Sequence, residues 1–229
     1  MDQVIIQTPT PSLEESIRFY ESLDFHNIPD IEGNLYTDGK VLVDINEDRF
    51  GRLGFKFYKK NWIAELDKLK QCTTVIEISQ GYLTTDPNGI WVYLISQERT
   101  TLALGEKSFS KLGNYAGVSI ETISMAKSLD FYHIFGIVLS AGSVDNPWMT
   151  LTHPSGFNIS FMKPLSCPHL FFNPSLTYFN GKSNTDIIAA IRKEDIPITE
   201  NITYFNEKAE VENVIIRDPG GLGFFIFND

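Results

Sequence analysis

The chain has 229 residues, of which 42% are hydrophobic and 13% aromatic, so it can bury a core and is not intrinsically disordered. Its formal net charge of -10 argues against nucleic acid or an anionic membrane as partner, since both reward clustered Lys and Arg. Two distant cysteines, no basic-then-apolar leader and no run of ~18 apolar residues lead us to expect a cytoplasmic protein.

The first predicted elements are a short apolar strand over residues 4–6 and a helix that begins after Ser12. Ser12 and Glu15 are spaced as a capping box, in which each side chain bonds the other's backbone N–H. Three more strand–helix pairs are predicted at residues 53–57 with 61–69, 117–121 with 125–135, and 176–179 with 186–192, the last with Ser183 and Asp186 as a capping box. Alternating segments broken by Gly and Pro turns follow each helix, so the unit is a strand, a helix and two or three strands.

Two motifs indicate an internal repeat. Ser-x-x-Phe-Tyr occurs at residues 16–20 and again at 128–132, and Asp-Pro-x-Gly occurs at 86–89 and again at 218–221. A polar tract without strand periodicity separates the two copies. The predicted organisation is therefore a domain at residues 1–98, a linker at 99–113 and a second domain at 114–229.

The segment at residues 12–20, with Leu-Asp-Phe at 23–25, resembles the first helix of vicinal-oxygen-chelate proteins. That superfamily includes glyoxalase I, bleomycin-resistance proteins, fosfomycin-resistance enzymes and extradiol dioxygenases. The Asp-Pro-x-Gly turns resemble the turn before its last strand, and the resemblance covers nearly the whole chain as two copies. It implies an α+β fold of two tandem glyoxalase-like domains, each a cup-shaped mixed sheet made from paired βαβββ units. Enzymes of the family hold one divalent metal in the cup through His and Glu side chains.

Carried onto this chain, the metal-ligand positions of the family hold no ordinary ligand. They fall at Ile5, Arg52 and Tyr93 in the first domain, and at Gly117, Ser175 and Phe225 in the second, with Ser160 on an intermediate strand. Isoleucine, glycine and phenylalanine offer no ligand atom, and Arg is a permanent cation that repels a metal. None of the four histidines (His26, His133, His153, His169) falls on a predicted cup strand. We therefore expect neither metal nor cofactor.

Strand alternation predicts the groups that face each cup. In the first domain, Arg52 and Lys56 share a face, with Gln7, Trp91 and Tyr93 on neighbouring strands. Cationic, amide and aromatic groups together suit an anionic, planar ligand, because Arg binds carboxylates in a bidentate manner. The alternative is that Arg52 and Lys56 simply extend to the solvent at the rim.

In the second domain, Ser119 and Glu121 share a face with Gly117, and Ser160, Ser175 and Phe225 complete the expected ligand-binding set. A carboxylate in an apolar cup has a raised pKa and can act as a general base, which makes Glu121 the one candidate catalytic residue. The alternative places Glu121 at the strand end, in solvent.

These residues predict a protein like the glyoxalase and bleomycin-resistance proteins that binds a small anionic or aromatic molecule without metal, as a monomer or homodimer. Binding is expected rather than turnover. Two alternatives stay open: a metal-dependent lyase or dioxygenase of the same superfamily with displaced ligands, and a structural or partner-binding pair of domains.

Overall fold

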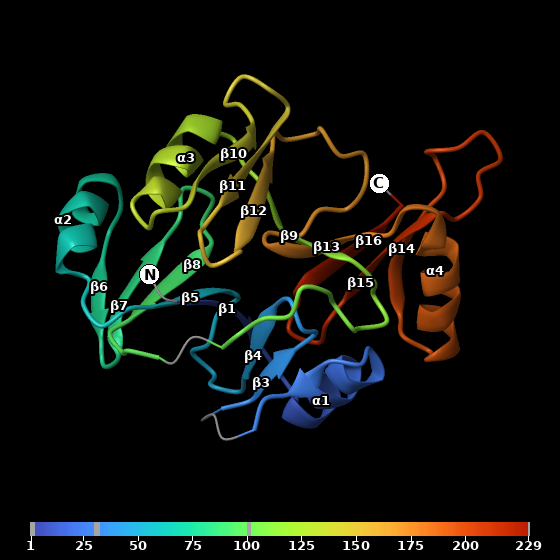
Figure 1. Ribbon diagram of the computed structural model, residues 1–229, viewed down its shortest axis with the longest axis horizontal. Helices are drawn as coiled ribbons and strands as arrows, with labels where there is room; N and C mark the ends of the chain where they lie inside the picture. Colours follow the sequence, from blue (N-terminus) through green and yellow to red (C-terminus); the bar gives the residue numbers. More distant parts are fainter. Residues whose placement is uncertain (1–2, 30–32, 100–101, 229) are drawn as a thin grey trace.

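A computed structural model describes residues 3–29, 33–99 and 102–228 and contains two eight-stranded sheets (Figure 1). The strand order is β2-β3-β4-β1-β5-β8-β7-β6 in the first sheet and β10-β11-β12-β9-β13-β16-β15-β14 in the second. Each order is the same arrangement of two βαβββ units, whose first strands pair antiparallel at the sheet centre. The structure therefore confirms the predicted α+β fold of two tandem glyoxalase-like domains.

The first sheet consists of β1 (Gln3–Pro9), β2 (His26–Asn27), β3 (Leu35–Thr37), β4 (Leu42–Asn46), β5 (Gly54–Tyr58), β6 (Ile76–Ile78), β7 (Gly81–Thr85) and β8 (Trp91–Ile95). The second consists of β9 (Tyr115–Glu121), β10 (Val138–Gly142), β11 (Trp148–Thr152), β12 (Asn158–Met162), β13 (Ser175–Phe179), β14 (Ile198–Ile202), β15 (Asn213–Arg217) and β16 (Gly223–Phe227). The stretch between β8 and β9 includes the predicted linker.

Four helices lie on the outside of the sheets: α1 (Leu13–Ser22), α2 (Ile63–Cys72), α3 (Met125–His133) and α4 (Asn184–Lys193). The Ser12 side chain accepts a 3.4 Å hydrogen bond from the backbone N–H of Glu15, as the predicted N-cap requires. The predicted cap at Ser183 is wrong. A 3-10 turn over Gly181–Ser183 precedes α4, so Ser183 already has helical backbone angles and its side chain makes no cap bond.

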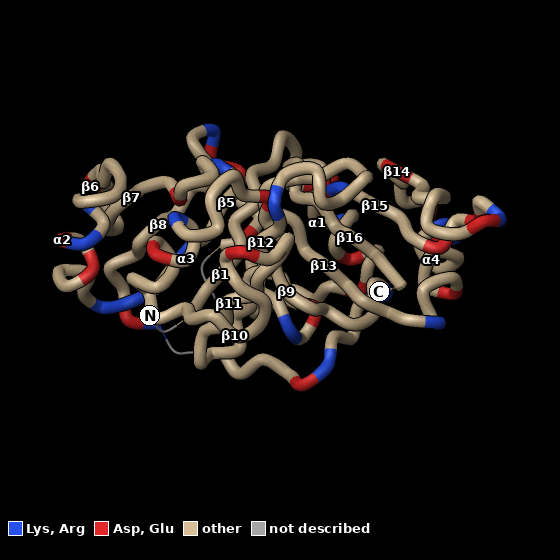
Figure 2. The backbone as a smooth tube through the Cα atoms, turned by 90° about the horizontal axis from the view of Figure 1, so that it is seen from above, with Lys and Arg blue, Asp and Glu red and all other residues tan. Residues whose placement is uncertain are grey.

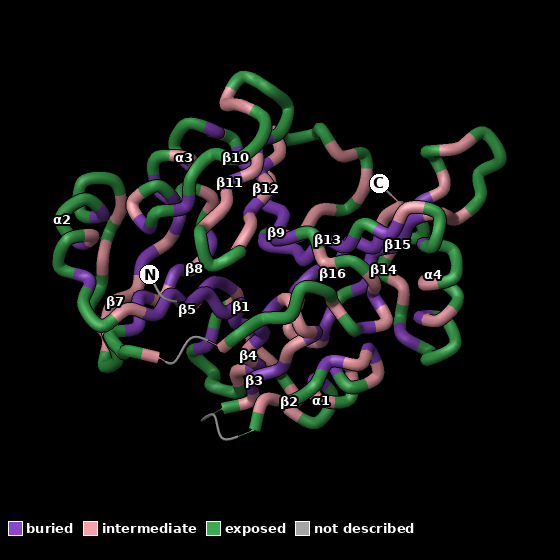
Figure 3. The backbone as a smooth tube through the Cα atoms, viewed as in Figure 1, coloured by how far each residue is buried: buried purple, intermediate pink, exposed green. Residues whose placement is uncertain are grey.

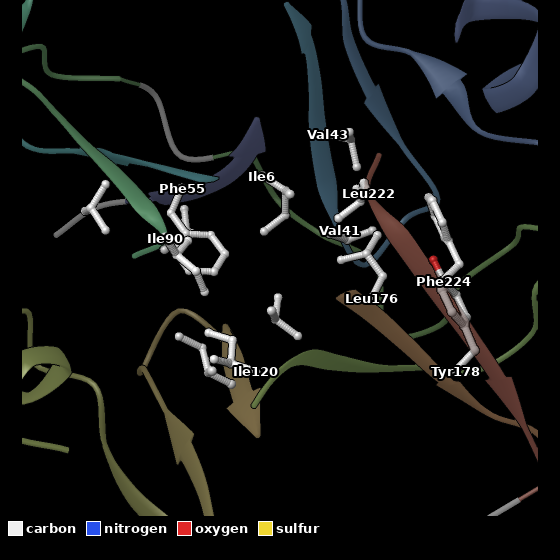
Figure 4. Packing of buried hydrophobic residues seen from close by; sticks show 14 of the residues in the cluster. Ile6, Val41, Val43, Phe55, Ile90, Ile120, Leu176, Tyr178, Leu222 and Phe224 are labelled. Carbon is white, nitrogen blue, oxygen red and sulfur yellow. The ribbon is translucent and has the colours of Figure 1, made fainter. Parts of the chain in front are cut away.

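A single hydrophobic core joins the two domains. Strand alternation sends Val4 and Ile6 into it, while Ile5 faces the opposite side of the sheet. Figure 4 shows side chains of the first domain, such as Ile6 and Phe55, beside Ile120 and Leu176 of the second. Burying each such side chain stabilises the fold by roughly 1.5–3 kcal/mol. The purple central strands in Figure 3 mark this shared core.

One face of each sheet is buried in the shared core, which leaves the opposite face of each sheet, the cup, to be covered by ligand or by protein. Acidic and basic residues are interspersed over the outer loops and helices (Figure 2). No helix within the described residues is long and apolar enough to cross a membrane.

Candidate functional site

The register of the first sheet corrects one predicted cup residue. Ile5 pairs with Lys56, and Lys56 pairs with Tyr93, so the position between Ile5 and Tyr93 is held by Lys56 and not by Arg52. Arg52 precedes β5, which begins at Gly54. A Lys ammonium has no lone pair and is itself a cation, so this row does not suit a divalent metal.

The Arg52 side chain lies on the loop at the rim of the first cup. It is exposed, and its guanidinium donates hydrogen bonds to the carbonyl oxygens of Gly51 (2.8 Å) and Arg49 (3.3 Å). Only its backbone turns to the cup, where the Arg52 N–H donates to the Tyr93 hydroxyl over 3.2 Å. Arg52 therefore does not face the first cup beside Lys56 as expected, because carbonyls of its own loop accept the hydrogen bonds of its guanidinium.

Lys56 does face the first cup, but its charge is already paired. The ammonium forms an ion pair with the carboxylate of Asp44 on β4, and each side chain is 17% exposed. Asp44 reaches Lys56 across β1, where Gln7 is the register partner of Asp44 and Ile5 that of Lys56. The first cup therefore holds a neutralised pair rather than a cation free to bind an anion.

The rest of the first cup is filled by the protein itself. Five apolar side chains pack together on this face with Leu102 of the linker: Ile5, Leu35, Leu42, Tyr58 and Ile95. The Gln3 side-chain amide holds the linker through two bonds to the Leu102 backbone, at 3.3 and 3.5 Å. The Gln7 amide donates to the Arg52 carbonyl (2.8 Å) and accepts from Asn46 (2.9 Å). Two of the predicted cup residues, Trp91 and Tyr93, are half-buried on β8. The polar side chains of this cup form hydrogen bonds and an ion pair within the protein.

The register of the second sheet corrects a second residue. Gly117 pairs with Thr177, and Thr177 pairs with Phe225, so the middle position belongs to Thr177 and not to Ser175. The Ser175 hydroxyl is fully buried and donates to the carbonyl of Phe172. This row offers a single neutral hydroxyl where a divalent ion needs several convergent donors. Within the described ranges, no cluster of three His, Cys, Asp or Glu could hold a metal. The residues present do not fit the metal that the fold family implies.

A cavity of about 460 Å³ opens in the second cup, over β11, β12, β9 and β13. This volume falls within the range typical of small-molecule sites. Hydroxyl side chains lie on the strands beneath it, aromatic and sulfur-containing side chains line its walls, and no charged side chain of the described chain lines it. The lining residues used below are Ser119, Thr150, Ser160 and Thr177 for the hydroxyl floor, and Trp148, Met162, Cys167 and Phe179 for the walls.

The four hydroxyls form a row across four neighbouring strands. The oxygen atoms of Ser119 and Thr177 are 2.6 Å apart, and those of Thr150 and Ser160 are 2.9 Å apart. Ser160 and Ser119 are register partners on adjacent parallel strands, so the two hydroxyl pairs are side by side. Ser119 and Thr177 are 2% and 4% exposed, which places this pair deep in the cup.

Glu121 fastens a loop over the cup and does not line the cavity. Its carboxylate accepts a 3.1 Å hydrogen bond from the backbone N–H of Leu165, and its own backbone exchanges two bonds with the Asn173 side chain. These contacts tie the end of β9 to the loop over residues 163–174. Glu121 therefore holds this loop in place and does not line the cavity.

That same loop closes the other half of the second cup. The His169 ring stacks on Phe171 with centroids 6.1 Å apart and meets Phe225 and Phe227 edge-on at 5.2 and 5.1 Å. Phe225 is thus covered by the loop, and it does not line the cavity. Cys167 of the loop does line it. Burial, together with the negative charge of Glu121, raises the pKa of the Cys167 thiol, which keeps it protonated and poorly nucleophilic.

Sequence reasoning missed Thr150, Thr177, Trp148 and Cys167. Residues two apart on a strand share a face, so the assignment of Ser175 to the cup also indicates Thr177. The loop residue Cys167 carries no such signal, because its place depends on how the loop folds back. His26, His133 and His153 do not line this cavity. The structure corrects the prediction for His26, which lies on β2 of the first sheet, where its exposed ring stacks on Phe109.

Comparison with known proteins bears on the fold. No family model matches the sequence, and no curated protein matches it. Solved structures match almost the whole chain. The 2,3-dioxygenase LapB from Pseudomonas sp. KL28 has a TM-score of 0.56 and 15% identity, covering 96% of this chain and 89% of that one. A variant of homoprotocatechuate 2,3-dioxygenase from Brevibacterium fuscum has a TM-score of 0.58 and 12% identity, covering 98% and 70%. A variant of 4-hydroxymandelate synthase from Streptomyces coelicolor has a TM-score of 0.55 and 11% identity, covering 96% and 90%.

At these identities the likeness establishes the fold and not the activity. The chain has the vicinal-oxygen-chelate fold of these structures, built as two tandem domains with one eight-stranded sheet each.

Proposed function

We propose that this chain binds a small organic molecule with an aromatic or otherwise apolar body in its second cup, without a metal ion. The observation that carries the proposal is the cavity of about 460 Å³, with a hydroxyl floor and apolar walls, over β11, β12, β9 and β13. A concave, mainly apolar site with a few convergent polar groups is the usual form of a small-molecule site. The likeness to dioxygenases supports the cup as the ligand site but not their chemistry.

The donor chemistry of the cups supports binding over metal-dependent turnover. The row Gly117, Thr177 and Phe225 lacks the His and carboxylate donors that a catalytic divalent ion takes. Among the residues that the structure describes, no His or carboxylate lines the cavity to activate a hydroxyl as nucleophile, and the Cys167 thiol has a raised pKa. The first cup is a poorer candidate for the ligand site. Its Lys56 is paired with Asp44, and Leu102 packs on the apolar residues that face this cup.

The test is a thermal-shift screen of the purified full chain against neutral and charged aromatic fragments, run with EDTA and again with added Fe²⁺, Mn²⁺ or Zn²⁺. A ligand that prefers the folded state raises the melting temperature. We expect aromatic fragments to raise it equally in EDTA and in metal, and Trp148→Ala to weaken their effect. Phe50→Ala is the matched control, since Phe50 is an aromatic side chain of the first domain that is 83% exposed. Stabilisation by a metal alone, or fragment hits that Trp148→Ala leaves unchanged, would overturn the proposal.

A further inference from the structure

We infer that the ligand of the second cup is uncharged and presents acceptor oxygens to the hydroxyl row formed by Thr150, Ser160, Ser119 and Thr177. This inference rests on the proposed function and specifies the class of molecule that the cup takes.

The first argument is a count of hydroxyl protons. In the pair of Ser119 and Thr177, one O–H donates to the other oxygen, and the accepting hydroxyl keeps its own proton. The pair of Thr150 and Ser160 is in the same situation. Within residues 3–29, 33–99 and 102–228, neither pair has a further hydrogen-bond partner for its side-chain oxygens. Each pair therefore retains one O–H donor for a ligand or for solvent.

Because the pair of Ser119 and Thr177 is buried, its remaining O–H donor favours ligands that carry an acceptor oxygen. Ser119 and Thr177 are 2% and 4% exposed, so a ligand seated on them displaces the solvent that would otherwise accept this proton. A buried donor left without an acceptor costs free energy, whereas a donor that meets an acceptor oxygen does not. A bare hydrocarbon of the same shape therefore binds less well than a molecule with a carbonyl or lactone oxygen at that point.

The charges around the cavity exclude an anion. No Lys, Arg or His of the described chain lines the cavity. Burial and the Glu121 carboxylate together raise the pKa of the Cys167 thiol in the wall, so a negative charge lies close to this side of the cavity. Moving a carboxylate ligand out of water into such a site is costly, because no cation compensates for its lost hydration. The predicted preference for an anionic ligand therefore does not extend to this cup.

The spacing of the donors indicates two acceptors on one edge of the ligand. Ser160 and Ser119 are register partners on adjacent strands, which lie about 4.8 Å apart. The two hydroxyl pairs can thus serve two oxygens of a planar molecule, while Trp148 and Phe179 contact its apolar body. Aromatic lactones and aromatic diketones have this combination.

The experiment compares three bicyclic probes of similar size: coumarin, naphthalene and 2-naphthoate. Coumarin has two acceptor oxygens and no charge, naphthalene has no acceptor, and 2-naphthoate carries a carboxylate. The readout is the protection of Cys167 from alkylation, measured by mass spectrometry in Cys72→Ser full-length protein, where Cys167 is the single remaining thiol. A hydrogen bond contributes a factor of about 2 to 12 in affinity. We expect coumarin to bind roughly tenfold more tightly than naphthalene, and 2-naphthoate to bind more weakly than coumarin.

Matched variants locate the preference on the hydroxyl row. Ser119→Ala with Thr177→Val, and separately Ser160→Ala with Thr150→Val, should lower coumarin affinity and leave naphthalene affinity unchanged. Thr150 and Ser160 are only half-buried, so the variant of this pair still tests the inference if the variant of Ser119 and Thr177 does not fold. Naphthalene or 2-naphthoate binding as tightly as coumarin, or a preference that survives both double substitutions, contradicts the inference and leaves the proposed function standing. Failure of all three probes to protect Cys167 contradicts both.

Discussion

The hydroxyl group of Tyr20 in α1 donates a 2.9 Å hydrogen bond to the carboxylate of Asp218, 198 residues further along the chain. The other half of the molecule repeats the bond, with Tyr132 of α3 donating to Asp86 over 3.0 Å. Each tyrosine ends a Ser-x-x-Phe-Tyr motif and each aspartate begins an Asp-Pro-x-Gly turn. The two repeated motifs therefore bind each other reciprocally across the two domains.

Replacing either tyrosine with phenylalanine should destabilise the chain to a similar extent. Each substitution removes a bond to a buried carboxylate, and hydrogen bonds to charged groups contribute about 1.5–3 kcal/mol. Urea unfolding of Tyr20→Phe and Tyr132→Phe at neutral pH measures the loss. Tyr204→Phe is the control, because Tyr204 is exposed and its hydroxyl reaches Glu200 over 3.4 Å. A Tyr20→Phe variant as stable as the control would contradict this account of the domain contact.

The loss of unfolding free energy caused by replacing either tyrosine with phenylalanine should grow with pH. Burial raises the pKa of both Asp218 and Asp86, and the bonds from Tyr20 and Tyr132 counteract part of that rise. A carboxyl whose pKa is higher in the folded state loses stability as pH rises from its unfolded value of about 3.9 through the folded value. Without the tyrosine hydroxyl the pKa of the aspartate in the folded state rises further. The free energy of unfolding therefore falls by a larger amount once the pH exceeds that pKa. Urea unfolding at pH 4 and pH 8 should show a smaller effect of Tyr20→Phe at pH 4, and equal effects would refute the linkage.

Lys56 and Asp44 should behave as a coupled pair in the first cup. Both side chains are 17% exposed, so removing one partner leaves the other charge poorly solvated. Lys56→Met or Asp44→Leu alone should cost about 1–3 kcal/mol of stability, and the double variant should cost less than the sum. The exposed pair of Arg18 and Glu14 is the control and should show no measurable coupling. Additive single substitutions at Lys56 and Asp44 would show that the ion pair is not maintained in solution.

The Cys167 thiol should report the charge of Glu121. Burial and the Glu121 carboxylate together raise the pKa of this thiol, so its thiolate is scarce at neutral pH. Glu121→Gln removes the charge, while its amide oxygen can still accept the bond from the Leu165 N–H. The midpoint of the pH–alkylation profile of Cys167 should therefore move to lower pH in this variant. A rate that rises equally at every pH would instead indicate that the loop has loosened.

The fold could be predicted from short-range signals, because capping residues, turn residues and the two repeated motifs each report on local backbone and together define the βαβββ unit. Strand alternation also assigned Ser119 to the second cup and Lys56 to the first. Alternation alone does not define the pairing of strands, however. The predicted middle positions Arg52 and Ser175 were wrong for that reason, as register places Lys56 and Thr177 there.

Two further features depend on tertiary packing that no local pattern carries. The ion pair between Lys56 and Asp44 spans β1, so it follows from the order of strands and not from their sequences. The covering of Phe225 by His169 depends on how a loop without regular structure folds back over the sheet. The first contact neutralises the charges of the first cup, and the second covers one half of the second cup, so strand alternation alone predicts neither.

A crystal structure of the chelator-treated chain soaked with coumarin tests the central claim most directly. The account predicts the bicyclic ring in the second cup against Trp148, with its oxygens within hydrogen-bond distance of the hydroxyls of Ser119 or Thr177 and of Thr150 or Ser160. It also predicts no anomalous signal from a transition metal beside Gly117, Thr177 and Phe225 after growth in Fe²⁺ or Zn²⁺. Coumarin bound outside this cup, or a metal coordinated within it, would contradict the account.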